Sequence, residues 1–263
     1  MRSFASDNNS GVHPAIMEAL TRANQDHALG YGDDSWTKEA VRKIKEIFVA
    51  DCEPLFVFNG TGSNVIALQL LTRPYNSIIC AETAHVYVDE CGSPVKMTGC
   101  QIRPVATPDG KLTPELIVPY LHGFGDQHHS QPGAVYLSEC TELGTIYTPE
   151  ELRAITALAH QHGMRVHMDG ARIANACAAL GLPLKALTVD CGIDVLSFGG
   201  TKNGLMMGEC VIVFDDSLKV EARFVRKQSA QLASKMRYLS CQFIPYLEND
   251  LWLENARKAN SSA

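Results

Sequence analysis

The sequence predicts an α/β fold, a three-layer sandwich in which helices cover both faces of a mostly parallel sheet. Short apolar runs typical of buried strands alternate with turns and amphipathic helices along the chain. Clear start and stop signals mark several of these helices. The chain has 263 residues and no internal repeat or low-complexity tract, so it can bury a sizeable core in one large domain or two modest ones.

The expected elements follow one another in this pattern. Residues 15–23 and 37–48 show helical periodicity near the N-terminus. Residues 55–58 then form a buried strand, residues 60–62 a turn and residues 64–71 a helix. The later strands are expected at residues 77–80, 101–105, 134–138, 165–168, 193–198 and 210–214.

Helix signals are clearest where a capping threonine precedes proline and glutamate. Thr148, Pro149 and Glu151 open one such helix, and Gly163 ends it. Thr113 opens another in the same way. In an open α/β sheet ligands bind beyond the carboxyl ends of the strands, so polar residues at those ends are the candidates for a site.

Composition argues against nucleic-acid and membrane partners. Lys and Arg number 23 against 29 Asp and Glu, a net charge of −6. The nine cysteines are scattered without a Cys-x-x-Cys pair, which indicates reduced thiols rather than disulfides or a metal site. No signal peptide or apolar span of ~20 residues is apparent, so we expect a cytoplasmic protein whose partners are small molecules or copies of itself.

Three segments at predicted strand ends carry candidate chemistry. Residues 59–64 form a glycine-containing turn before a helix, which suits a phosphate but is also typical of an ordinary strand-to-helix turn. Asp169 ends a strand, although Asp-Gly is often only a turn. Lys202 lies among small residues, where a partly desolvated amine attacks aldehydes, while a solvated lysine is the plain alternative.

These groups together match the needs of pyridoxal phosphate. Its phosphate binds a helix N-terminus, its ring nitrogen a carboxylate and its aldehyde a lysine amine. His85 also comes after a strand and could supply a flat partner for the ring, although a lone histidine is more often structural. The order of turn, Asp169 and Lys202 along one sheet therefore favours this cofactor.

The chain resembles the threonine aldolases of the aromatic amino acid β-eliminating lyase group. These are pyridoxal-phosphate enzymes with the fold of aspartate aminotransferase, also called fold type I. The resemblance covers nearly the whole chain. It rests on residues 6–8, 31–34, 58–61, 82–85, 167–172, 199–204 and 234–237, of which Gly-Gly-Thr-Lys-Asn-Gly and Met-Asp-Gly-Ala-Arg are the most specific in combination.

The resemblance implies a role for each matching residue. Lys202 would hold the cofactor covalently, Asp169 would pair with its ring nitrogen and His85 would stack on the ring. Other members of the implied site hold the phosphate or the substrate. Gly60, Thr61 and Thr201 would bind the phosphate, and Ser6 and Arg172 the substrate carboxylate, with Arg172 also beside the cofactor; Ser6 and Arg172 could instead be structural.

The resemblance leaves the catalytic base open. Glu142 stands where better-known relatives place a histidine, and His129, just before a strand, is a second candidate or a solvated loop residue. Relatives also continue into a small C-terminal domain. We therefore expect residues 1–250 to form the large cofactor-binding domain and residues 251–263 the start of a small domain that is largely absent.

The activity implied by the resemblance is aldol cleavage of L-threonine, L-allo-threonine and related β-hydroxy-α-amino acids to glycine and an aldehyde. The alternatives are β-elimination on the same cofactor and a truncated, inactive remnant that keeps the fold. Members of the group commonly form dimers or tetramers with sites at the interface. Lys227 or Arg237 could then reach a neighbour's phosphate, or both could simply be solvated.

Overall fold

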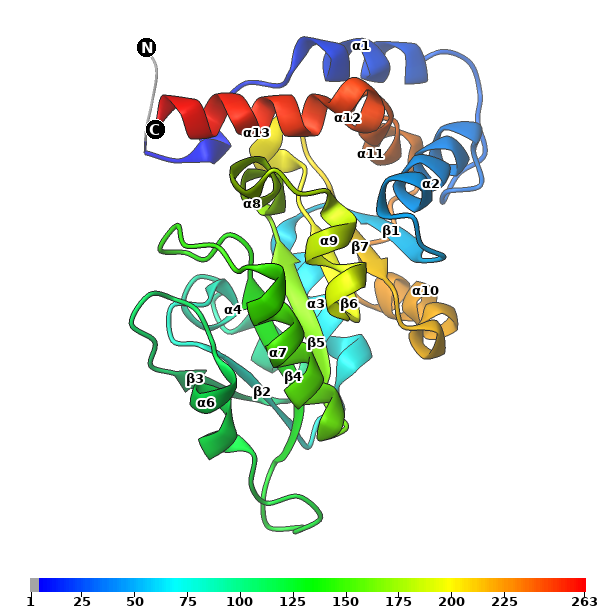
Figure 1. Ribbon diagram of the computed structural model, residues 1–263. Helices are drawn as coiled ribbons and strands as arrows, with labels where there is room; N and C mark the ends of the chain where they lie inside the picture. Colours follow the sequence, from blue (N-terminus) through cyan, green and yellow to red (C-terminus); the bar gives the residue numbers. More distant parts are fainter. Residues whose placement is uncertain (1–4) are drawn as a thin grey trace.

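A computed structural model describes residues 5–263; residues 1–4, where the polar N-terminal segment begins, lie outside it. Its centre is a seven-stranded sheet with the order β1-β7-β6-β5-β4-β2-β3 (Figure 1). The strands are β1 (Glu53–Val57), β2 (Asn76–Ala81), β3 (Gln101–Val105), β4 (Gln131–Ser138), β5 (Arg165–Gly170), β6 (Val195–Phe198) and β7 (Glu209–Val213). Strands β3, β2, β4, β5 and β6 are parallel to one another, and β7 runs antiparallel to β6 and β1.

Helices connect and cover these strands. They are α1 (Pro14–Ala23), α2 (Ser35–Phe48), α3 (Gly60–Leu71), α4 (His85–Val88), α5 (Ser93–Thr98), α6 (Pro114–Ile117), α7 (Pro149–Gln161), α8 (Ile173–Leu180), α9 (Leu184–Leu187), α10 (Lys219–Gln228), α11 (Arg237–Ser240), α12 (Phe243–Leu247) and α13 (Leu251–Ser262). Short 3-10 helices are η1 (Asp7–Asn9), η2 (Val118–Tyr120), η3 (Val189–Cys191), η4 (Thr201–Asn203), η5 (Asp216–Leu218) and η6 (Glu248–Asp250).

The sheet is buried on both faces, which confirms the predicted three-layer sandwich. Successive residues of a strand point to opposite faces. In β6, Leu196 and Phe198 join the core cluster that includes residues of α2, α7, α8 and α9, whereas Val195 joins the cluster that includes α3 and α10. Both clusters are made of buried apolar side chains, which explains why the strands are nearly continuous hydrophobic runs in the sequence.

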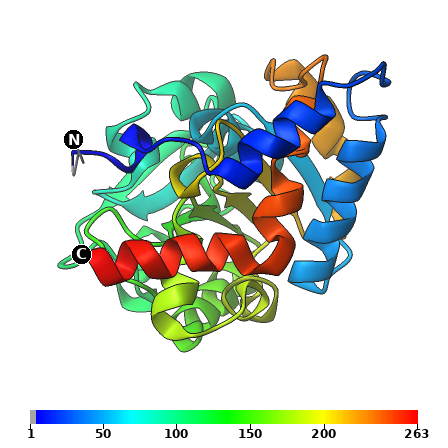
Figure 2. The same ribbon diagram turned by 90° about the horizontal axis from the view of Figure 1, so that it is seen from above.

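Helices near the two ends of the described chain lie together at one end of the sheet. Helices α1, α11, α12 and α13 lie together above the strands in Figure 1, and Figure 2 shows α13 crossing that end. Helix α13 packs against α8. Residues 251–262 thus form a helix on the large body of the molecule, and the predicted division into domains stays a prediction.

One local expectation needs correction, and two helix starts are confirmed. The predicted turn at residues 60–62 is instead the first turn of α3, because Asn59 caps the helix by accepting a hydrogen bond from the N–H of Gly62 at 2.8 Å. The helix opened by Thr113 is the single turn α6, which continues as η2. The longer helix after Thr148 is confirmed as α7, with both hydrogen bonds of the capping box.

All nine cysteines are free thiols, and seven of them are buried. In the part of the chain that the structure describes, no single helix is long and apolar enough to cross a membrane. One bent pair, Ile173–Leu180 with Leu184–Cys191, passes that test by length and composition only.

Candidate active site

A pocket at the carboxyl ends of β4 and β5 gathers most of the predicted site residues. It lies where α3, α4 and η4 approach the sheet. Its lining includes Gly60, His85, Glu142, Asp169, Arg172 and Lys202. The pocket therefore brings together residues that are more than a hundred positions apart in the sequence.

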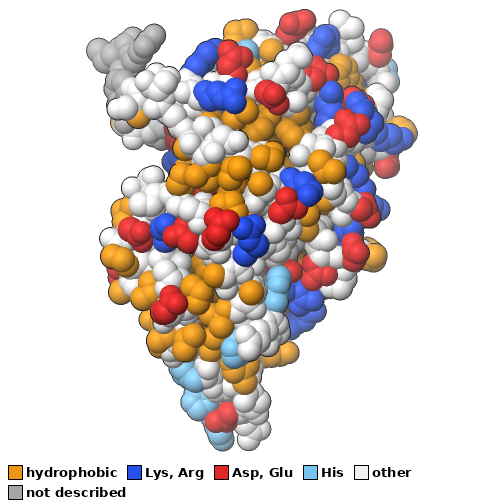
Figure 3. Space-filling view, in the orientation of Figure 1, with side chains coloured by type: hydrophobic (Ala, Val, Ile, Leu, Met, Phe, Trp, Pro, Cys, Tyr) orange, Lys and Arg blue, Asp and Glu red, His pale blue; other side chains and the backbone are white. Residues whose placement is uncertain are grey.

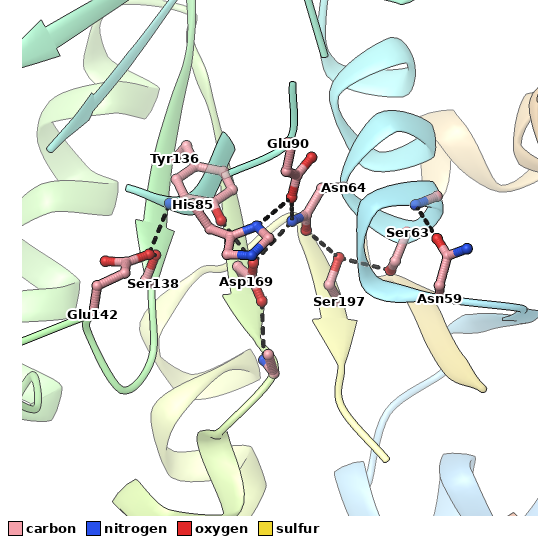
Figure 4. A network of polar contacts seen from close by, with 12 residues as sticks. Asn59, Ser63, Asn64, His85, Glu90, Tyr136, Ser138, Glu142, Asp169 and Ser197 are labelled. Atoms are coloured by element: carbon pink, nitrogen blue, oxygen red, sulfur yellow. Dashed lines mark hydrogen bonds and ion pairs between the residues drawn. The ribbon is translucent and has the colours of Figure 1, made fainter. Parts of the chain in front are cut away.

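Asp169 is the most tightly held group of the pocket. Its Oδ2 accepts hydrogen bonds from the Tyr136 hydroxyl at 2.7 Å and from Nδ2 of Asn64 at 2.8 Å, and its Oδ1 accepts from the N–H of Ala171 at 3.0 Å (Figure 4). Burial favours the neutral acid, but the hydrogen bonds from Tyr136 and Asn64 outweigh it and hold the pKa of Asp169 below its ordinary value. The buried carboxylate is therefore ionised at neutral pH.

His85 begins α4 and is held from two sides. Its ring Nδ1 lies 2.8 Å from Oε1 of Glu90, and its backbone N–H donates to Oε1 of Glu142 at 2.9 Å (Figure 4). The same oxygen of Glu142 accepts from the Ser138 hydroxyl at 2.6 Å. The hydrogen bond with Glu90 raises the pKa of His85, although burial opposes this.

Lys202 lies in η4, at the end of a tightly packed glycine turn. A Cβ on Gly199 would lie 2.4 Å from the carbonyl oxygen of Ala171, and one on Gly200 would lie 2.3 Å from Cδ1 of Leu205. Only glycine fits there without a shift of the backbone or the core. Within residues 5–263 the Lys202 ammonium has neither a hydrogen bond nor an ion pair, so its amine is available to a ligand.

The buried Glu209 supports this turn from below. Its Oε2 accepts a hydrogen bond from the N–H of Gly200 at 2.7 Å. Burial raises the pKa of Glu209 to about 7, although hydrogen bonds from Thr201 and Gly200 oppose the shift. The carboxyl group next to the Lys202 turn is therefore poised to titrate near neutral pH.

Two of the predicted phosphate residues, Gly60 and Thr61, begin α3, and the third, Thr201, begins η4. Gly60 lines the pocket, whereas Thr61 and Gly62 line an adjoining cavity of about 290 Å³. The first turn of a helix leaves N–H groups without partners inside the helix. The hydroxyl of Thr201 accepts from the N–H of Gly208 at 3.1 Å. Phosphate binding by Gly60, Thr61 and Thr201 stays a prediction.

The two residues predicted to bind the substrate carboxylate lie in different places, and their role stays a prediction. Arg172 reaches the pocket, but its guanidinium pairs with Asp7, with Nε 2.7 Å and Nη2 3.2 Å from the two carboxylate oxygens. Ser6 is exposed and caps η1 by accepting from the N–H of Asn8 at 3.2 Å. Ser6 is therefore outside the pocket lining, and its hydroxyl is already used by the backbone.

His129 is far from the pocket within this chain. Its Nδ1 lies 2.9 Å from the carboxylate of Asp126, in the loop that precedes β4. That loop forms the lower tip of the molecule in Figure 1, at the amino end of β4, and Figure 3 shows histidine side chains gathered there. Because the pocket is at the opposite end of the strand, His129 cannot act as the base in its own chain.

Sequence reasoning missed the residues that hold the site from behind. Asn64 and Ser197 are buried and hydrogen-bonded to each other, and Tyr136 and Glu90 are buried beside Asp169 and His85. Ser197 is the one polar residue of the apolar strand β6, a pattern that could have identified it. Glu90 carried no comparable signal, because it comes after a single-turn helix.

Comparisons with known proteins show what the chain is similar to. Residues 3–261 match the model of a family described as beta-eliminating lyase. The chain is 44% identical over 263 residues to low specificity L-threonine aldolases of Pseudomonas sp. and Pseudomonas aeruginosa, covering 100% of this chain and 76% of each relative.

Solved structures extend the comparison. A threonine aldolase from Leishmania major superposes with a TM-score of 0.94 at 34% identity, over 99% of this chain and 76% of that one. An aspartate aminotransferase from Thermus thermophilus superposes with a TM-score of 0.72 at 14% identity, over 97% of this chain and 67% of that one, which shows a shared fold alone.

Proposed function

The chain belongs to the beta-eliminating lyase family, and on this premise we propose that it is a pyridoxal-phosphate-dependent aldolase. Its substrates would be L-threonine, L-allo-threonine and related β-hydroxy-α-amino acids, and its products glycine and an aldehyde. The observation that carries the proposal is the single pocket that joins Lys202, Asp169 and His85 at the carboxyl end of the sheet. Relatives named low specificity L-threonine aldolase, alignable over the whole chain, support it.

The residues present fit the cofactor. A buried carboxylate that stays ionised, Asp169, suits a protonated ring nitrogen, and the unpaired amine of Lys202 suits an aldehyde. Pyridoxal phosphate, when bound, supplies a ring that takes up the electron pair left at the substrate Cα when a bond to that carbon breaks. Asp169 would hold the ring nitrogen protonated, and His85 would lie against the ring.

Arg172 is the residue best suited to hold the substrate carboxylate. Its planar guanidinium already binds a carboxylate with two hydrogen bonds, that of Asp7. A substrate carboxylate would replace Asp7 on the same two donors. The contact decides which substrate bond is held in the reacting orientation, and so which reaction occurs.

Proton transfer from the β-hydroxyl requires a base in the pocket. Glu142 and His85 are the two candidates that the pocket lining includes. One oxygen of Glu142 accepts from Ser138 and from the N–H of His85, which orients its carboxylate at the pocket edge. Such a group can accept a proton within hydrogen-bond reach. A role for His129 would require a neighbouring subunit.

We also propose that the chain forms a homodimer or homotetramer. An apolar cavity of about 590 Å³ lies beside the site and is lined by Phe58, Met206 and Met207, which are 38%, 40% and 45% exposed. Phe58 precedes α3 and the two methionines come after the Lys202 turn, so a second copy seated there would lie against the elements that build the pocket. Light scattering after gel filtration tests this, and a monomeric mass would contradict it.

The two basic residues suggested for a neighbour's phosphate point elsewhere in the single chain. Lys227 lies over the ring of Tyr31, 5.5 Å from its centroid, and Arg237 donates to the carbonyl of Asp26. Their contact with a neighbour's phosphate stays a prediction, as does the cytoplasmic location.

The first experiment is to incubate the purified chain with pyridoxal phosphate, reduce it with borohydride and map the modified peptide by mass. We expect a pyridoxyl adduct on Lys202. A separate, unreduced sample loaded with pyridoxal phosphate should release glycine and acetaldehyde from L-threonine in equal amounts. Release of 2-oxobutanoate would indicate β-elimination, and a folded protein without the adduct would support the inactive remnant.

A further inference from the structure

Glu90 is a fully buried carboxylate outside the pocket lining that contacts two of the lining residues, His85 and Asn64. It comes after α4, and its side chain is 0% exposed. Its Oε1 lies 2.8 Å from Nδ1 of His85 and accepts a hydrogen bond from Nδ2 of Asn64, also at 2.8 Å. Its Oε2 is buried without a hydrogen-bond partner. Leaving a carboxylate oxygen in this state is costly, which indicates that the position serves a purpose other than stability.

The contact between Glu90 and His85 determines the proton on the imidazole. An ionised carboxylate only accepts hydrogen bonds, so the proton between the two groups belongs to Nδ1 of His85. In the neutral ring the other nitrogen, Nε2, then carries a lone pair and no proton. Because His85 lines the pocket, Nε2 is the ring atom left for a ligand.

Asn64 ties this arrangement to Asp169. Its Nδ2 donates one hydrogen to Oε1 of Glu90 and one to Oδ2 of Asp169, both at 2.8 Å. Its Oδ1 accepts from the hydroxyl of Ser197 at 3.0 Å, which fixes the orientation of the amide. Both carboxylates are therefore positioned by one amide nitrogen, as Figure 4 shows.

We propose that Glu90 is a positioning residue that holds the His85 ring with Nδ1 protonated and offers Nε2 to the pocket as a proton acceptor. The inference rests on the proposed function, because a proton acceptor on His85 matters when a substrate proton must move. Beyond the proposed contact of the His85 ring with the cofactor, the proposal specifies which nitrogen of that ring carries the proton. Glu90 acts through His85 and does not line the pocket itself.

Charged groups from four elements surround His85. Glu90 after α4 and Asp169 on β5 favour the imidazolium, and Lys202 in η4 opposes it. Glu142 accepts from the backbone N–H of His85. Glu90 is the one member of this set in hydrogen-bond contact with the ring among the described residues, so its removal has the largest effect on the ring.

Nitrogen-15 NMR of the histidine ring tests the proposal in the unmodified protein. With the chain both free of pyridoxal phosphate and loaded with it, we expect the His85 signals of a ring that is protonated at Nδ1 and bare at Nε2 above its pKa. A ring protonated at Nε2 would overturn the proposal. This readout does not depend on catalysis, so it stays informative if aldolase activity is absent and the proposed function fails.

Variants at position 90 extend the test. Glu90→Gln keeps an acceptor oxygen but removes the charge, so the Nδ1–H tautomer should persist while the pKa of His85 falls. Glu90→Leu removes the acceptor, so the Nε2–H tautomer should become the major form. Asp89→Asn, an exposed neighbour with the same loss of charge, is the matched control and should change neither.

Kinetics separate positioning from a merely structural role. Glu90→Gln should lower kcat by about 10- to 100-fold with little change in KM, and should shift the acidic limb of the pH profile with the pKa of His85. An unshifted pH profile in a folded Glu90→Gln protein, with wild-type kcat, would contradict the proposal. Retention of the borohydride adduct at Lys202 would show that the cofactor is still held, so that any loss lies in a later step.

Discussion

Two buried carboxyl groups flank the Lys202 turn, and their charge states differ. Asp169 at the end of β5 receives three hydrogen bonds, and its pKa lies below the ordinary value. Glu209 at the start of β7 receives a hydrogen bond from the N–H of Gly200, with Thr201 also contributing, and burial raises its pKa to about 7. At similar burial, the hydrogen-bond donors decide whether a carboxyl group is charged.

The difference suits two separate tasks. Asp169, whose pKa lies below the ordinary value, is ionised at neutral pH and can hold a positive charge in the pocket, as the proposed cofactor requires. Glu209 instead supports a turn in which Gly199 and Gly200 allow no side chain. Asp169 thus carries a negative charge in the pocket where the chemistry is proposed, and Glu209 titrates beside the glycine turn that it supports.

Replacement of the fixed charge should have the largest effect. Asp169→Asn keeps the shape but removes the negative charge, so we expect kcat to fall by about 10³-fold. Borohydride labelling at Lys202 should persist, because the amine is untouched. Steady-state release of glycine from L-threonine measures the loss. Activity within tenfold of wild type would show that the charge of Asp169 is not used.

Glu142 provides the exposed counterpart of these two buried groups. Glu142→Gln removes a proton acceptor at the pocket edge, so we expect a loss of about 10²-fold in kcat if it is the base. His129→Ala is the contrast, because His129 is remote from the pocket of its own chain. Rate measurements on both variants over pH 5–9 decide between them. A large loss in His129→Ala alone would place the base on a neighbouring subunit.

Much of the site could be predicted from the sequence because it depends on local rules. Asp169 lies at the end of β5, Lys202 follows β6 after a short glycine turn, and the carboxyl ends of parallel strands meet at one edge of a sheet. Asn59 is of a preferred capping type, although the sequence predicts the start of its helix four residues too late. Residues that end a strand or begin a helix can therefore be recognised in the sequence.

The remainder depends on contacts that no local pattern encodes. Asp7 and Arg172 are separated by 165 positions, and their pairing occupies a guanidinium that the sequence assigned to substrate. Glu90 meets Asn64 only because α3 and the segment after α4 are packed side by side. The antiparallel β7 likewise places Glu209 under Gly200. Such pairs are consequences of the sheet order.

Glu209 should make stability depend on pH. Its folded-state pKa of about 7 lies above the ordinary value of 4.5, so its contribution is fully present below pH 4.5 and is lost as pH rises through 7. Glu209→Gln should abolish this loss, which amounts to at most about 3 kcal/mol in the free energy of unfolding. Urea unfolding of both proteins at pH 5 and pH 8 measures it. The exposed Glu221→Gln is the control, and equal pH dependence in all three proteins would contradict the assignment.

The smallest expected effect concerns the carboxylate of Asp7, which is one-third exposed and competes with substrate for Arg172. A pair this exposed is worth about 1 kcal/mol at most. Asp7→Asn should therefore lower KM for L-threonine by no more than about fivefold, the equivalent of that free energy, and leave kcat unchanged. Raised salt should lower the wild-type KM toward that of the variant if screening of the pair dominates. A rise in KM in Asp7→Asn would show instead that Asp7 positions Arg172. The Arg172 guanidinium at the pocket edge would then be held in place before substrate binds, as the buried carboxylate of Asp169 is.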